Sequence, residues 1–581
     1  MYRFKVLQSL SALNFRPDRP PWPVRFFYFA HLTPLRKFPP SVRHSSMLFC
    51  IIQRPNNQPK TDIIMKLIRF ALPLLLLLIF QPALHAQDAV PEDFESWVEE
   101  KMEIWGIPGL AVSVVKGDEV VYASGFGVKQ LGSNEPVDEH TQFGIASVSK
   151  HMTASALGIL VDRGFIDWDD KVIDHINWFE LSDPWATANV TIRDLLTHQV
   201  GVGRMLGNRL QFMTNRDPEE LIYRMRYHDF EQPFRSDYVY SNMMYSTAGQ
   251  IITEVSGLSF GEFLERHFFG PMEMTRTNSS IYDIVDGDNA AYPHQEIEGE
   301  VQEIQRRSWD NAAPAGGVNS SVTDMATWIR MQLGDAGYLD GERILHSETM
   351  RDIQTPKVSQ PIGSQLNPQR SYGFGLSITD YEGHRVLSHG GATDGFNTIY
   401  MLVPEKELGV IVVTNLFSSF QQAIAYSIVD HHLEVEEPTD WHERYWSNYQ
   451  DRYDRAMERR EEFEAKRQED TSTSRPLNEY VGYYTDDLYD KVEIRGEDGE
   501  LVLELWDDEN LTADLEHWHY DTFRINWRNP AQREEFLQFR LGMDGEVESL
   551  DIQFTLRPSL LQVGAYPTDY YRVVNFDKMD L

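Results

Sequence analysis

The chain has 581 residues, of which 41% are hydrophobic and 12% aromatic. A chain of this length divides into two or more domains, and this composition excludes whole-chain disorder and a collagen-like structure. The formal net charge of −36 repels phosphate backbones, so nucleic-acid binding has no support. The single cysteine, Cys50, excludes an internal disulfide framework and a cysteine-rich zinc site.

The first 86 residues differ from the rest of the chain. Residues 1–64 hold ten Lys and Arg against two Asp and Glu, whereas the remainder is acidic. From Met65 a short basic start leads into an apolar run, which ends at a small-residue cleavage site, Ala86. This pattern predicts a signal peptide over residues 65–86. The apolar run is shorter than the ~20 residues that span a bilayer, which disfavours the alternative of a membrane anchor.

A signal peptide belongs at the N-terminus of a protein. We therefore expect residues 1–64 to be a mis-called extension; the alternative is a genuine basic arm. The mature protein is then expected to be periplasmic or secreted, without a membrane anchor.

The pattern of residues 87–435 predicts an α+β domain. Two β-hairpins with charged turns lie far apart in sequence, at residues 110–124 and 398–414, and could share one antiparallel sheet. The segment between them shows helical spacing at residues 150–163, 191–197, 246–256, 261–269 and 323–333. The layout is an antiparallel sheet with an inserted helical region.

The remainder predicts a linker and a second domain. Residues 436–475 contain a long charged and aromatic run, which indicates a solvated helical linker; an amphipathic helix that binds a partner is the alternative. Residues 476–581 hold short strands separated by turns, at 480–484, 492–495, 501–505, 523–527, 536–541 and 549–554. Repeated hairpins over such a length favour a small β-barrel or a sandwich. We expect a small all-β barrel domain of lipocalin-like form.

One group of motifs carries chemistry. Ser147 and Lys150 are three apart at the start of an apolar helix, so they share a face and the amine can reach the hydroxyl. A lysine shielded from water can act as the base that a serine nucleophile needs. The Ser-x-x-Lys pattern is weak alone, but Tyr240-Ser241-Asn242 and His389-Gly390-Gly391 follow in order. A histidine beside two glycines on an edge strand can line a cleft.

These residues resemble the class C β-lactamase and D-alanyl-D-alanine peptidase group of serine hydrolases. The resemblance covers about residues 92–430 and includes Trp105-Gly106-Ile107-Pro108-Gly109 and Pro314-Ala315-Gly316-Gly317. The tail resembles the small β-barrel domain that often follows members of this group. The resemblance therefore implies a β-lactamase/transpeptidase-like fold.

The resemblance also implies a role for each matching residue. Ser147 would be the acylated nucleophile, Lys150 its base and Tyr240 the proton shuttle. Asn242, His389 and Gly391 would contact the substrate, and the backbone N–H groups of Ser147 and Ala392 would form the oxyanion hole. His389 stands where many members have lysine. A neutral imidazole anchors a carboxylate more weakly than lysine, so tight penicillin binding is not expected.

The expected function is an exported serine hydrolase that forms an acyl-enzyme on a short ester or a D-amino-acid peptide. A β-lactamase and a non-catalytic penicillin-sensing or binding protein are the alternatives. Neither a metal nor an organic cofactor is expected, because the histidines outside the site suit structural roles. The expected partner is a small-molecule or peptide substrate, and the oligomeric state stays open.

Overall fold

A computed structural model describes residues 89–203, 211, 214, 216–284, 288–297, 299–334, 337–339, 341–361, 369–506, 508–532, 534–555 and 571–579. The predicted extension (1–64) and signal peptide (65–86) lie outside the described residues. Within the described ranges, no helix combines the length and the apolar character that crossing a membrane requires.

The first domain is built on an eight-stranded sheet with the order β2-β1-β14-β13-β12-β11-β10-β9. Its strands are β1 (Gly109–Lys116), β2 (Glu119–Gly127), β9 (Val358–Gln360), β10 (Arg370–Tyr372), β11 (Ser377–Tyr381), β12 (His384–Thr393), β13 (Phe396–Val403) and β14 (Leu408–Thr414). The two predicted hairpins do share this sheet, since β1 pairs with β14 in an antiparallel register from Leu110↔Thr414 to Lys116↔Leu408. Two segments that are far apart in the sequence thus lie side by side in one sheet.

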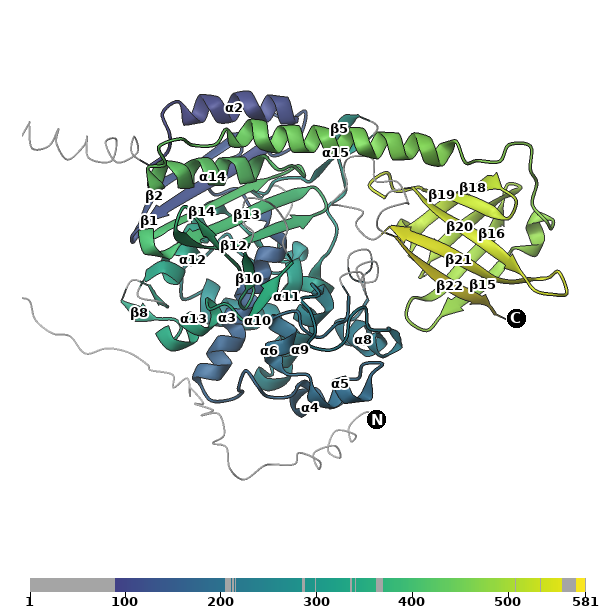
Figure 1. The fold of residues 1–581 in the computed structure, drawn as a ribbon, viewed down its shortest axis with the longest axis horizontal. Helices are drawn as coiled ribbons and strands as arrows, with labels where there is room; N and C mark the ends of the chain where they lie inside the picture. Colours follow the sequence, from purple (N-terminus) through teal and green to yellow (C-terminus); the bar gives the residue numbers. More distant parts are fainter. Residues whose placement is uncertain are drawn as a thin grey trace, which may run out of the picture. The chain divides into compact units, whose positions relative to one another are not determined.

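Helices cover both faces of the sheet (Figure 1). On one face, α2 (Phe94–Trp105), α14 (Phe420–Leu433) and α15 (Trp441–Glu464) share an apolar cluster with the strands. On the other face lie α3 (Ser149–Asp162) and α12 (Val322–Leu333). The remaining helices are α4 (Val172–His175), α5 (Pro184–Asn189), α6 (Ile192–Leu196), α8 (Pro218–Arg224), α9 (Asn242–Ser256), α10 (Phe260–Leu264), α11 (Ala313–Gly316) and α13 (Ser347–Ile353).

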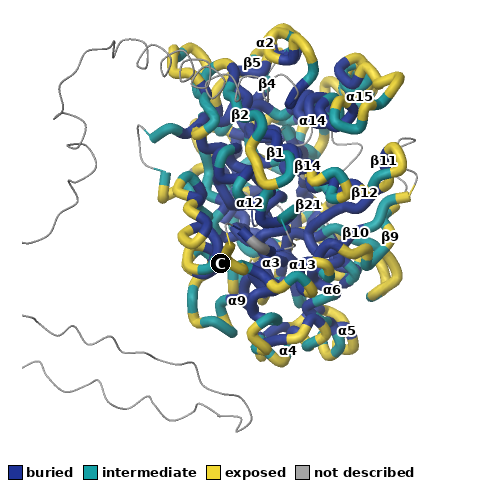
Figure 2. The backbone as a smooth tube through the Cα atoms, turned by 90° about the vertical axis from the view of Figure 1, so that its left-hand side faces the viewer, coloured by how far each residue is buried: buried dark blue, intermediate teal, exposed yellow. Residues whose placement is uncertain are grey.

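The burial pattern explains why α3 is central. Every residue from Ser149 to Leu160 is buried, so this helix is enclosed on all sides rather than amphipathic. Figure 2 shows the buried backbone (dark blue) concentrated in the sheet and the helices against it, with exposed positions along α15. A helix enclosed in this way gives the residues at its N-terminus a fixed position.

The sequence-based helices are largely confirmed. The helix expected at 246–256 begins earlier, at Asn242, and the one expected at 261–269 consists of α10 followed by a π-helical turn, Glu265–Phe269. The predicted linker helix is α15, whose first part packs on the first domain through Trp105 and Trp446 (ring centroids 4.8 Å apart). Short two-stranded pairs complete the domain: β3 (Phe143–Gly144) with β6 (Asn319–Ser320), β4 (His294–Ile297) with β5 (Glu300–Glu303), and β7 (Tyr338–Leu339) with β8 (Glu342–Arg343).

The second domain is a closed antiparallel barrel, as predicted. Its strands are β15 (Gly482–Asp486), β16 (Asp490–Glu497), β17 (Glu500–Leu505), β18 (Thr512–His519), β19 (Thr522–Trp527), β20 (Glu535–Leu541), β21 (Val547–Thr555) and β22 (Tyr571–Lys578). Tyr484 pairs with Lys578 between the first and last strands, which closes the barrel and removes the sheet edges. Aromatic side chains such as Tyr480 and Phe539 (ring centroids 4.6 Å apart) fill its interior.

Candidate active site

Ser147 lies in a tight turn at the entry to α3. Residues Ala146–Val148 form a 3-10 turn that runs directly into the helix, and Ala146 has a left-handed φ of 51°. A positive φ at a non-glycine residue is strained and persists only where the surroundings impose it. Because the turn continues into α3, side chains three apart lie on the same face, and Ser147 stands over Lys150. Ser147 is partly exposed while its neighbours on both sides are buried.

The Lys150 amine is fully buried and has three polar neighbours. Its Nζ lies 2.7 Å from Asn242 Oδ1, 2.6 Å from Ala315 O and 3.2 Å from Ser147 Oγ. The first two atoms are amide oxygens and only accept hydrogen bonds. A neutral amine can donate its two protons to them and turn its lone pair toward Ser147, which is the geometry a general base needs.

Tyr240 approaches the same hydroxyl from another direction. Its OH lies 3.0 Å from Ser147 Oγ, and Lys150 Nζ lies 4.8 Å from the centre of its ring. Ser147 Oγ therefore lies within hydrogen-bonding distance of both groups. The three residues predicted to be catalytic are brought together by the fold.

His198 supports the segment that carries Tyr240. Its Nδ1 accepts a hydrogen bond from the Ser241 backbone N–H at 3.1 Å, and its ring lies 4.4 Å from the Tyr240 ring. His198 therefore has a structural, hydrogen-bonding role. The sequence identified the residue type but contained no sign that its partner would be the motif itself.

Asn242 occupies the first turn of α9 and faces Lys150. Its side-chain oxygen accepts from Lys150, so its carbonyl helps to hold the base; contact of its amide with a substrate stays a prediction. The second acceptor, Ala315 O, comes from α11. Sequence reasoning noted Ala315 only as part of a matching motif, because a backbone carbonyl leaves no residue-type signal.

The end of β12 lies beside the turn that carries Ser147. The strand was expected at a sheet edge; this is wrong, since β12 lies between β11 and β13. Its pairing with β11 nevertheless stops at Ser388, so the stretch from His389 to Thr393 pairs with β13 alone among the described strands.

Two glycines allow close approach around Ser147. A Cβ on Gly391 would lie 2.3 Å from Ile145 O, so only glycine lets β12 pack this closely against the turn. Gly316 lies on the other side of the turn, where an added Cβ would be 3.8 Å from the Ser147 backbone nitrogen, an ordinary contact distance. Ala392, the other predicted oxyanion donor, is partly exposed next to Gly391.

His389 is buried at the start of this stretch. Its Nε2 lies 3.0 Å from the Tyr372 OH on β10, and its Nδ1 lies 2.7 Å from the Gly390 carbonyl oxygen. Burial, together with the nearby charge of Lys150, lowers the pKa of His389 to about 3. The imidazole is therefore neutral at ordinary pH, and Tyr372 is a neighbour that the sequence did not reveal.

The described residues contain no cluster of three or more His, Cys, Asp or Glu able to hold a metal ion. His517 and His519 are separated by a β-bulge in β18, and they bond to Tyr520 O and to the Gln468 N–H respectively. Their contacts are those of structural residues.

The fold and the site define a β-lactamase/transpeptidase-like serine hydrolase class. A family model described as Beta-lactamase matches residues 94–434, and the chain belongs to this family. A second model, a domain of unknown function (DUF3471), matches residues 466–563 in the barrel region.

Individual relatives are distant. The unguisins hydrolase ungD' of Aspergillus campestris is 26% identical over 81% of this chain and 88% of its own length. The unguisins hydrolase ungD of Aspergillus violaceofuscus is 26% identical over 61% of this chain and 67% of its own length. The octameric penicillin-binding protein homologue from Pyrococcus abyssi has a similar fold, with a TM-score of 0.53, 22% identity, and coverage of 84% of this chain and 99% of that one.

Proposed function

We propose that this protein is an exported serine hydrolase that forms an acyl-enzyme at Ser147 and hydrolyses short esters or D-amino-acid peptides. The observation that carries the proposal is the position of Ser147 Oγ between Lys150 Nζ (3.2 Å) and the Tyr240 OH (3.0 Å). The hydrolase names of the two fungal relatives support the reaction class. The signal-peptide pattern before Gln87 supports export.

In the acylation step, Ser147 Oγ attacks the carbonyl carbon while its proton passes to the neutral Lys150 amine. The carbonyl oxygen takes up negative charge, and the backbone N–H groups of Ser147 and Ala392 would stabilise it. The bond to the leaving group breaks as Tyr240 donates a proton to that group. Lys150 then returns a proton to Tyr240, which leaves an ester on Ser147.

In the deacylation step, water attacks the Ser147 ester as a proton moves to the Tyr240–Lys150 pair. The Ser147 oxygen leaves and regains its proton, and the acid product departs. Each step uses one nucleophile, one proton acceptor and one oxyanion site. Asn242 and Ala315 keep the Lys150 amine in position throughout, because their oxygens bind it at 2.7 and 2.6 Å.

A fluorophosphonate probe followed by intact-mass measurement tests the nucleophile. The wild type should gain one probe adduct, and Ser147→Ala should gain none while it stays folded. Ser133→Ala, at a partly exposed serine in the loop after β2, is the matched control and should label normally. Labelling that persists in Ser147→Ala would place the nucleophile elsewhere.

A substrate panel tests the reaction class. p-Nitrophenyl acetate, a D-amino-acid p-nitroanilide and a chromogenic cephalosporin cover ester, amide and β-lactam chemistry. We expect turnover of the ester or the anilide and poor turnover of the cephalosporin. Cephalosporin hydrolysis near ~10⁶ M⁻¹s⁻¹ in kcat/KM would instead establish a β-lactamase.

A further inference from the structure

The hydrogen bonds of His389 fix one tautomer of its ring. Tyr372 is 1% exposed, and burial raises the pKa of its hydroxyl well above the ordinary value, so this hydroxyl keeps its proton. The Gly390 carbonyl only accepts, so His389 Nδ1 must carry the proton and donate to it. Neutral His389 therefore accepts from the Tyr372 OH through Nε2.

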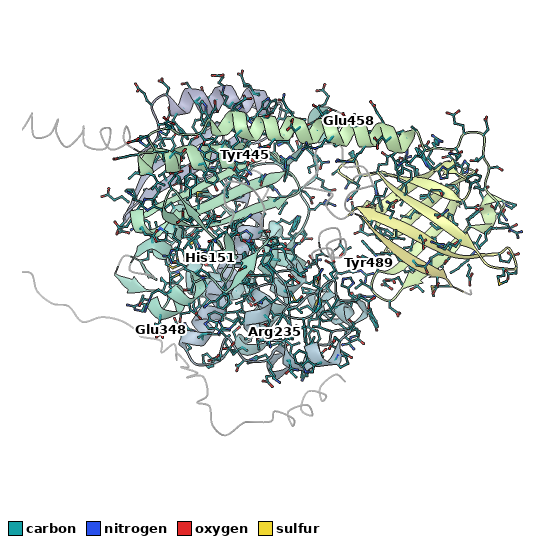
Figure 3. The ribbon with its side chains drawn as sticks, viewed as in Figure 1. His151, Arg235, Glu348, Tyr445, Glu458 and Tyr489 are labelled. Atoms are coloured by element: carbon teal, nitrogen blue, oxygen red, sulfur yellow. The ribbon has the colours of Figure 1, made fainter. Side chains whose placement is uncertain are left out.

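The groups around His389 oppose a second proton on its ring. Arg370 acts on it from β10, and Lys150 acts on it from α3 whenever its amine carries a proton. The uncharged Tyr240 and Tyr372 rings lie 6.4 and 6.0 Å from the imidazole. His151 itself is fully buried in the interior (Figure 3) and stays neutral, because burial lowers its pKa to about 3. Arg370 directs its guanidinium to Ser377 Oγ at 3.3 Å.

We propose that Tyr372 is a positioning residue that locks His389 in its neutral Nδ1–H tautomer, so that this subsite selects acyl substrates without a carboxylate beside the scissile bond. Both ring nitrogens bond to the protein, so the ring has no N–H to offer an anion. The substrate meets an uncharged aromatic edge where a lysine would provide an ammonium group. This inference rests on the proposed function and names the substrate class of the same site.

A matched pair of esters measures the selection. 3-Carbamoylphenyl acetate and 3-carboxyphenyl acetate share one skeleton and differ at the meta substituent, a neutral carboxamide or a carboxylate. Each rate is divided by the hydroxide-catalysed rate of the same ester, which removes the difference in leaving-group acidity. The wild type should prefer the neutral ester by about tenfold or more in kcat/KM, and His389→Lys should shift the ratio toward the anion by at least about tenfold. A wild-type preference for the anionic ester would overturn the proposal. A preference for the neutral ester that disappears in Arg370→Gln would overturn it as well.

Tyr372→Phe tests the lock itself. Without the donor to Nε2, the neutral imidazole loses a stabilising bond and the pKa of His389 should rise. The anion-to-neutral ratio of kcat/KM should then increase as pH falls from 7.5 to 5 in Tyr372→Phe, and stay flat in the wild type. If Tyr372 had a merely structural role, Tyr372→Phe would lower kcat/KM for both esters by the same factor at every pH, and that result would contradict the proposal.

Nitrogen NMR separates this inference from the proposed function. In the inactive Ser147→Ala protein, the His389 signals should report the neutral Nδ1–H tautomer from pH 5 to 8, and Tyr372→Phe in that background should change them. Assignment follows from their loss in His389→Asn. An imidazolium or an Nε2–H tautomer would overturn the lock, whereas continued hydrolysis by Ser147→Ala would overturn the proposed function alone.

Discussion

Replacing Lys150 with arginine separates two roles that a buried cation can have. Arginine keeps a positive charge but cannot lose its proton, so it has no lone pair for Ser147. In the structure, Lys150 Nζ reaches two fixed acceptors at 2.6 and 2.7 Å and the nucleophile at 3.2 Å. Positioned acid–base groups contribute about 10²–10⁴ in rate, so Lys150→Arg should lose at least ~10²-fold in kcat, or about 2.7 kcal/mol.

The assay compares three variants with p-nitrophenyl acetate from pH 6 to 9. Lys150→Met removes charge and base together, and Lys171→Arg, at an exposed lysine, is the matched control. Thermal unfolding checks that each variant folds, because a guanidinium in a fully buried site costs about 1–3 kcal/mol of stability through overpacking. If Lys150→Arg kept most of its activity while Lys150→Met lost it, Lys150 would act through its charge and the base assignment would be wrong.

Four further outcomes are expected. Burial lowers the pKa of His151 to about 3, so between about pH 6.5 and pH 3 the unfolded chain binds a proton at this residue and the folded chain does not. The free energy of unfolding should therefore fall as pH drops through this range, by about 2 kcal/mol at pH 5. His151→Phe should remove that share of the shift in the urea midpoint. Gly391→Ala should cut activity at least ~10-fold, because its Cβ would lie 2.3 Å from Ile145 O and displace β12; unchanged kinetics would contradict this packing. Deleting 476–581 should broaden the range of esters hydrolysed if the barrel restricts access, and unaltered selectivity would rule that out. N-terminal sequencing of the exported protein should begin at or within a few residues of Gln87, and a peptide from residues 1–64 in it would refute the processing scheme.

The fold was predictable where the pattern was local and regular. The two hairpins with charged turns correspond to β1–β2 and β13–β14, and they share one sheet as expected despite their long separation in sequence. The weak strands β9 to β11 were missed, because they are only three to five residues long and lack strict alternation. In the barrel, the predicted strand ranges leave out β18, and a bulge between His517 and His519 interrupts its alternation.

The site was predictable in its residues but not in its contacts. Ser147, Lys150 and Tyr240 were identified from the order of their motifs together with the resemblance to a known family. The atoms that make Lys150 a base, Asn242 Oδ1 and Ala315 O, depend on how α9 and α11 pack on α3, and a single sequence contains no measure of that packing.

His389 shows what this difference means for function. From the sequence alone it was a histidine in place of a lysine, with ring nitrogens available to a substrate. The decisive partner, Tyr372, lies on one of the missed strands, and its hydroxyl accounts for one ring nitrogen while Gly390 O accounts for the other. The sequence suggests that His389 contacts the ligand through its ring nitrogens, whereas the structure shows an imidazole whose two nitrogens are both bonded to the protein. Substrate selection at this position therefore depends on the residues behind His389 as much as on His389 itself.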